Sequence, residues 1–382
     1  MKVTRREILK ALVMTGGALG WRSTCGQTPV STDRLLGTLD FVDEPQISME
    51  RIIGRELDGR LFTDLSTLSS NTRITPTEKF YIRTCASSLL SDAGSWRIQL
   101  RGFGGFAGSS SSLAMDDLKE LARPCGVHLM ECSGNVEAGR FGLLSAAEWG
   151  GVPVSTLLER RGIGARMRVL VSGFDTYTSS SANSMPGASW IFSHEDLAVA
   201  RAFLATTMNS QPLSRDHGAP VRLVVPGWYG CCCIKWVNEI ALVEDGAAAT
   251  GQMQEFASRT HQAGIPALAR EFQPAVIDPA AMPVRVEKWL AKGKIQYRVA
   301  GILWGAPVRV NRLEIQFKPG GTFVPVTELL QRNEDAWRFW THTWSPTEPG
   351  RYTIRLRLAD PRIRTRRLDS GHYNRSVVIS EI

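Results

Sequence analysis

The pattern of the sequence changes near residue 276, and this change divides the chain into two differently built parts. "KIQYRVAGI", "VNRLEIQFK" and "GRYTIRLRLAD" alternate apolar and polar residues, with Pro, Gly and Asn between the runs. A period of two is typical of strands that bury one face, and several such strands in succession favour a sandwich of roughly 100 residues. Residues 276–382 are therefore predicted to form an antiparallel β-sandwich.

Residues 31–275 have another pattern, in which short apolar runs are mixed with helical segments. "MRVLVSGFD" (167–175) and "APVRLVVPG" (219–227) are predicted to be buried strands that end at glycine. "SHEDLAVARAFLATTMN" (193–209) is predicted to be one helix, opened by a Ser-x-x-Asp capping pair. A further short helix is expected within 145–162, after a Gly-Gly-Val-Pro turn. The predicted fold class is α+β.

The first 30 residues contain the parts of an export signal. Lys2, Arg5 and Arg6 are followed by a short apolar stretch loosened by glycine. The arginine pair resembles the twin-arginine export motif, which predicts a periplasmic or otherwise exported protein. That pathway carries folded proteins, commonly with a cofactor inserted before export. No run approaches the about eighteen apolar residues of a spanning helix, so no integral membrane segment is expected.

Charge is distributed unevenly between the two parts. The chain has a formal net charge of +8, and residues 283–382 hold 18 Lys and Arg against 9 Asp and Glu. The basic surface therefore belongs to the second domain. Because this domain has no interleaved nucleic-acid motif, an acidic partner or a cell surface is favoured over nucleic acid.

"VHLMECSGNVEAGRFG" (127–142) places one thiol, Cys132, between an apolar run and a glycine turn. Two interpretations follow from the residues alone. Cys132 is either a small buried apolar group or a thiolate that acts as nucleophile or soft metal ligand. The seven cysteines contain no C-x-x-C, so structural zinc and attached c-type haem are both disfavoured. Cys231, Cys232 and Cys233 follow a predicted strand and are expected to be buried thiols that alternate between two faces.

Several motifs together resemble the sulfite oxidase family of molybdenum enzymes. They are E-C-S-G-N, "AAEWGGVPVSTLLE", "HGAPVRLVVPGWYG…IKW" and, in the second part, "GILWGAPVRVNRLEIQFKPGG", in the family's order over about residues 70–380. The resemblance implies a molybdopterin-binding domain over 31–275. It also implies an immunoglobulin-like dimerisation domain over 276–382, which allows a homodimer.

The resemblance also assigns roles to individual residues. It implies that Cys132 ligates molybdenum, and that His217, Arg222 and Lys235 bind the molybdopterin cofactor. Arginine suits bidentate contact with phosphate, and lysine supplies a point charge. Arg83 matches an arginine that lies beside the metal and helps to hold the substrate.

The chain departs from the family's pattern at several positions around this site. Thr84 and Cys85 replace an Asn-His pair after Arg83. Glu137 stands where animal sulfite oxidases place a second arginine, and it would repel an anion unless it points away or Arg140 neutralises it. His261 is the nearest match to the family's active-site tyrosine and is taken as a catalytic candidate.

The implied reaction is two-electron oxygen-atom transfer, with sulfite oxidation as the default and a small oxoanion as substrate. Electrons would leave to a separate carrier such as a cytochrome c, because the chain has no haem motif. Two alternatives stay open. The chain could reduce an S- or N-oxide, or it could be a basic binding module without cofactor. The departures at Glu137 and His261 predict weak turnover of sulfite, or a preference for a neutral or larger oxide or sulfur compound.

Overall fold

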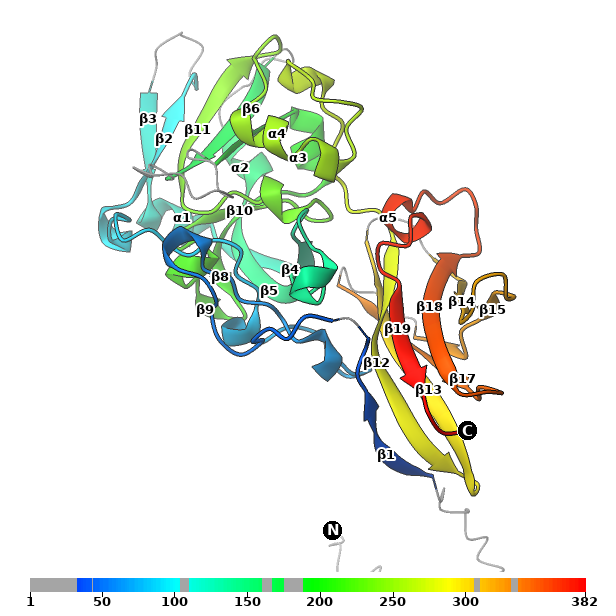
Figure 1. Ribbon diagram of the computed structural model, residues 1–382. Coiled ribbons are helices and arrows are strands. Elements are labelled where there is room, and N and C mark those ends of the chain that lie inside the picture. The colour runs from blue at the N-terminus through cyan, green and yellow to red at the C-terminus, as the bar shows by residue number, and fades with distance from the viewer. Residues whose placement is uncertain are drawn as a thin grey trace, which may run out of the picture.

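The computed structural model describes residues 33–42, 44–103, 110–159, 167–174, 188–305, 310–330 and 336–382. Within these residues the chain forms four β-sheets and five short α-helices, arranged as two domains side by side (Figure 1). The predicted export signal, residues 1–30, lies outside the described residues. None of the described helices combines the length and apolar character needed to cross a membrane.

Two sheets build the first domain, one antiparallel and one mixed, in which β2 and β11 pair in parallel. One has the order β10-β8-β5-β4, from Arg222–Val224, Phe203–Met208, Leu144–Pro153 and Arg123–Glu131, with β9 (Gln211–Pro212) paired to β8. The other has the order β3-β2-β11-β6-β7, from Ser110–Ala114, Arg97–Arg101, Val237–Glu244, Met167–Gly173 and Ser189–Phe192. The helices are α1 (Met115–Leu121), α2 (Val154–Glu159), α3 (His194–Val199) and α4 (Gly251–Phe256). The predicted α+β class is confirmed.

The second domain consists of two antiparallel sheets that face each other. One has the order β1-β12-β13-β17-β16, from Arg34–Leu39, Ala280–Ala291, Lys294–Trp304, Arg338–Trp344 and Glu328–Leu329. The other has the order β15-β14-β18-β19, from Val324–Pro325, Leu313–Gln316, Gly350–Leu358 and Arg375–Ile379, with α5 (Arg366–Asp369) before β19. Val299 and Trp340 of one sheet share a core with Ile354 and Val377 of the other. This packing fits the predicted sandwich.

The start of the described chain joins the second domain. β1 pairs with β12 from Arg34 opposite Leu290 to Leu39 opposite Val286. The predicted first domain, residues 31–275, therefore begins too early, because the strand over 34–39 belongs to the second domain. The reason is geometric. The edge of β12 presents backbone N–H and C=O groups that a neighbouring strand can pair with, and this pairing does not depend on how far apart the two strands are in the sequence.

The predicted helix over 193–209 is wrong in its second half. Ser193 caps α3 as expected, with its Oγ accepting the Asp196 N–H at 3.0 Å. The helix then ends, and Arg201 takes a positive φ of 52°. Residues 203–208 form β8 instead, between β5 and β10, because ladder hydrogen bonds to distant strands override a local helical pattern.

The two other predicted strands and the short helix are confirmed with narrower bounds, whereas the expected Gly-Gly-Val-Pro turn is the end of a strand. β6 covers Met167–Gly173 of the predicted strand over 167–175, and β10 covers only Arg222–Val224 of 219–227. The helix expected within 145–162 begins at Val154, after the long strand β5.

Candidate active site

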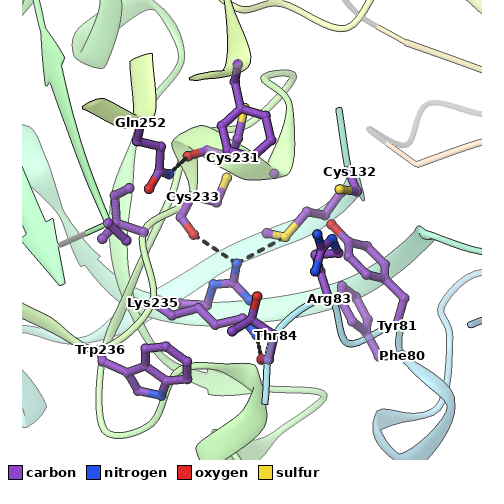
Figure 2. A pocket seen from close by; sticks show the side chains of 16 residues that line it. Phe80, Tyr81, Arg83, Thr84, Cys132, Cys231, Cys233, Lys235, Trp236 and Gln252 are labelled. Atoms are coloured by element: carbon purple, nitrogen blue, oxygen red, sulfur yellow. Dashed lines mark hydrogen bonds between the residues drawn. The ribbon is translucent and has the colours of Figure 1, made fainter. Parts of the chain in front are cut away.

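A cavity opens in the first domain where the end of β4 meets the loop segments 80–84 and 230–236 (Figure 2). Its lining combines thiols, cations and aromatic rings. These residues are Phe80, Tyr81, Arg83, Thr84, Met130, Cys132, Ala188, Arg222, Gly230, Cys231, Cys233, Ile234, Lys235, Trp236, Gln252 and Phe256. Four predicted site residues are therefore brought together from segments far apart in sequence, namely Cys132, Arg83, Arg222 and Lys235.

Cys132 is held at the end of β4 by its own turn. Its backbone N–H donates to Leu143 O at 2.9 Å, and Asn135 Oδ1 accepts the Leu143 N–H at 3.1 Å. The Gly134 N–H points at Cys132 Sγ, at 3.4 Å. Burial raises the pKa of the thiol, while Arg83 and the Gly134 N–H act in the opposite direction. The Ser-Gly-Asn turn thus fixes one sulfur atom at the cavity wall and offers it partial stabilisation as a thiolate.

Arg222 and Lys235 are cations that the protein holds by backbone carbonyls. Arg222 donates to His217 O and to Cys233 O, both at 3.1 Å. In the part of the chain that the structure describes, its buried Nε has no hydrogen-bond partner. Lys235 Nζ donates to Thr84 O at 2.8 Å and to Asp216 O. Arg222 Nη2 also lies 3.2 Å from Met130 Sδ. Both side chains line the cavity, where a guanidinium and an ammonium are suitable donors for an anion.

His217 lies behind the cavity wall. Its Nε2 pairs with Phe80 O at 3.1 Å and its Nδ1 with Ser214 Oγ at 2.8 Å, so both ring nitrogens are already engaged. Burial, and then the nearby charge of Lys235, lowers its pKa to about 4. His217 therefore positions the Phe80 backbone beside the cavity, and the predicted direct contact with a cofactor does not follow from this geometry.

His261 is also outside the cavity lining. Its Nε2 lies 3.1 Å from Tyr229 Oη and 3.6 Å from Asp278 Oδ2. The residue has a positive φ of 65° at the end of a 3-10 turn over Ser258–Thr260. In this arrangement the phenol of Tyr229 and the imidazole form one pair, although the sequence pattern offered only the histidine.

The suspected repulsion by Glu137 is not supported by its location. Glu137 opens a short 3-10 turn, is exposed, and does not line the cavity. Arg140 does not neutralise it either, since its guanidinium contacts Glu44, at 3.8 Å, and Pro45 O, at 3.0 Å. Repulsion of an anion is therefore avoided because Glu137 lies outside the cavity, and not because Arg140 neutralises it.

The run Cys231-Cys232-Cys233 contains two cavity residues that the sequence did not predict. Residues 230–232 form a 3-10 turn, so the expected alternation of strand faces is wrong. Cys231 and Cys233 line the cavity, and Cys232 is fully buried in the core. Gly230, directly before the three cysteines, is the feature of the sequence that could have indicated a turn and a close contact here. A Cβ added at this position would come within 2.7 Å of Tyr81 Oη. Cys85 does not line the cavity and packs against Gly59.

The donors present fit a molybdopterin cofactor with molybdenum. Cys132 offers a soft sulfur ligand, and Arg222 and Lys235 offer cationic donors for a phosphate. The unsatisfied Nε of Arg222 is a buried donor for which an acceptor is expected.

Comparisons with known proteins agree with this chemistry. The family model described as "Oxidoreductase molybdopterin binding domain" matches residues 86–250. Mitochondrial sulfite oxidase of Rattus norvegicus is 25% identical over 294 residues, covering 72% of this chain and 53% of the relative. The Homo sapiens enzyme is 26% identical over 291 residues, covering 70% and 52%. The chain thus spans about half the length of these relatives.

A solved structure has a similar fold. The sulfane dehydrogenase SoxCD from Paracoccus pantotrophus matches with a TM-score of 0.62 at 18% identity, covering 82% of this chain and 81% of that chain. The match extends over both domains described above.

Proposed function

Because the chain belongs to the sulfite oxidase family of molybdopterin oxidoreductases, we propose that it catalyses two-electron oxygen-atom transfer to a small sulfur oxoanion. The observation that carries the proposal is the buried thiol of Cys132, held at the end of β4 by the Ser-Gly-Asn turn and lining one cavity with Arg83. Bound molybdenum would supply the two-electron chemistry.

The residues of the chain have separate tasks in this proposal. Cys132 is the protein's sulfur ligand, held in direction by the Ser-Gly-Asn turn. Arg222 and Lys235, which line the same cavity, bind the anionic part of the cofactor. Arg83 lines the same cavity as Cys132, and its charge opposes the rise in the pKa of the thiol that burial causes, so it is proposed to hold an anionic substrate there.

Sulfite is the proposed substrate, in line with the curated relatives and with an arginine at the cavity wall. Electrons are proposed to leave to a separate carrier such as a cytochrome c. The exported location and the homodimer suggested by sequence are proposals of the same kind.

Metal analysis and turnover test the proposal together. Protein from a host that makes molybdopterin should contain close to one molybdenum per chain and oxidise sulfite. Cys132→Ser should reduce turnover to the background, because a hard hydroxyl replaces a soft thiolate. Cys125→Ser is the matched control, since Cys125 is a half-buried thiol of β4 outside the cavity. Metal-free wild type, or a Cys132→Ser variant that remains fully active, would overturn the proposal. Turnover of sulfoxides and N-oxides in place of sulfite would favour the reductase alternative.

Export has its own test. Replacing Arg5 and Arg6 by lysine keeps the charge and removes the pair that the export receptor reads. The precursor should then accumulate in the cytoplasm with cofactor bound. Secretion at the wild-type level would contradict the twin-arginine assignment.

A further inference from the structure

One segment of the second domain contacts the loop that carries Cys132. α5 and the turn after it lie at the junction of the two domains (Figure 1). Arg367 Nη2 donates to Ser133 O at 2.6 Å, and His372 Nε2 lies 3.0 Å from Asn135 O. The second domain therefore binds two backbone carbonyls of the turn that points Cys132 at the cavity.

The residue before Cys132 is held by the same domain. Glu131 is fully buried, and a buried carboxylate is costly unless its oxygens are satisfied. The Oε1 atom accepts from Tyr373 Oη at 2.7 Å, and Oε2 accepts from Trp304 Nε1 at 2.9 Å. Arg367 Nη1 adds a cation 3.5 Å from Oε1. These three donors belong to the second domain, whereas Asn135 Nδ2, at 3.3 Å from Oε1, is a neutral donor from the cysteine turn itself. The only cation among these four donors, Arg367, therefore comes from outside the molybdopterin domain.

Arg367 also joins a second segment to this loop. Its Nη2 donates to Arg259 O at 3.3 Å, and its guanidinium lies 4.8 Å from the ring centroid of Tyr229. Its side chain is only 14% exposed and does not line the cavity, so it is placed to act through its neighbours. One arginine thus ties the cysteine loop, the buried Glu131 and the 259–261 segment together.

We infer that the second domain positions the metal-ligating cysteine, and that Arg367 is the central positioning residue. The inference rests on the proposed function and adds to it a role for the second domain beyond dimerisation. Arg367 fixes the direction of Cys132 Sγ through the Ser133 carbonyl and cancels the charge of Glu131. Outer partners of metal ligands typically change affinity or activity by about 10–100-fold when they are removed.

The first test uses molybdenum-loaded enzyme. Arg367→Met should lower kcat for sulfite by about 10–100-fold, leave KM nearly unchanged, and alter the electron paramagnetic resonance spectrum of the reduced metal. Arg367→Lys keeps the charge but loses the forked geometry, so it should recover part of kcat. Arg362→Met, an exposed arginine paired with Asp360 before the same helix, is the control. A folded, loaded Arg367→Met enzyme with wild-type kcat and spectrum would overturn the inference.

A second variant covers the case in which Arg367→Met does not fold. Glu131→Gln combined with Arg367→Met removes the uncompensated charge, so the double variant should fold and load. It still lacks the contact with Ser133 O, and kcat should stay low. Recovery of wild-type kcat would show that Arg367 only balances charge, and the positioning role would be rejected.

A third measurement separates this inference from the proposed function. In cofactor-free protein, the rate of iodoacetamide labelling at Cys132 is followed by peptide mass spectrometry, with Cys125 as the internal reference. Arg367→Met should speed labelling of Cys132 several-fold and leave Cys125 unchanged. Equal labelling rates would reject the inference, whereas wild type without molybdenum or turnover would reject the proposed function alone.

Discussion

Removal of the imidazole at residue 217 is expected to change how the protein's stability depends on acid. The pKa of His217 falls from its ordinary value of 6.5 to about 4, through burial and then through Lys235. Between these two values the unfolded chain binds a proton that the folded chain does not, so stability falls as the pH drops from about 6.5 to about 4 and is fully present above 6.5. At 1.36 kcal/mol per pKa unit, this one group accounts for about 3 kcal/mol.

The assay is urea unfolding of wild type and His217→Gln at pH 7 and pH 4. Glutamine retains a donor and an acceptor near Phe80 O and Ser214 Oγ but does not titrate. Wild type should lose about 3 kcal/mol more than the variant between the two pH values. The lowered pKa of His372 is common to both proteins and cancels in the difference. Parallel losses in the two proteins would refute the argument that His217 is kept neutral by its surroundings.

Three other substitutions have defined outcomes. Gly301→Ala should destabilise the second domain by about 1–3 kcal/mol in urea unfolding, because the new Cβ would come within 2.3 Å of the Trp340 ring. Ser193→Ala should cost about 0.5–2 kcal/mol in the same assay through loss of the α3 cap, and an unchanged midpoint would argue against the cap. Glu137→Arg should leave KM for sulfite unchanged, because Glu137 is exposed outside the cavity, and a clearly lower KM would revive the repulsion argument.

Local signals predicted where elements begin better than where they end. The Ser193 cap depends only on residues three positions away, so it is visible in sequence. The switch from α3 to β8 depends on β5 and β10, whose strands supply the ladder partners of residues 203–208. Leu204 and Met208 fit a helical face and a strand core equally well, and only the distant partners decide between them.

The contrast between local signals and distant contacts also explains which site residues could be predicted. Cys132, Arg83, Arg222 and Lys235 were assigned through motifs, and they line one cavity. His217 belongs to the same motif, but the motif does not tell which side of the Phe80 backbone its ring occupies. A motif therefore identifies His217 but does not predict its contact with Phe80, which comes from a different segment of the chain.

Cys231 is the opposite case, since no motif singled it out. The run of three cysteines was predicted to leave a strand, which would alternate the thiols between faces. A 3-10 turn has about three residues per turn, so neighbouring side chains are spread around its axis instead. Two of the three thiols can then face one cavity while Cys232 fills the core.

Glu131 shows why the domain boundary in sequence is not the boundary of the site. In the quoted motif it is an acid before a cysteine, which on its own suggests a solvated strand end. Its side chain is instead fully buried, and such burial of a carboxylate is tolerable only with donors in place. Trp304, Arg367 and Tyr373 supply them from positions 173 to 242 residues further along the chain. A molybdopterin domain expressed without residues 276–382 would expose an apolar interface and leave Glu131 with Asn135 as the remaining one of these four donors, so the two domains form one structural unit.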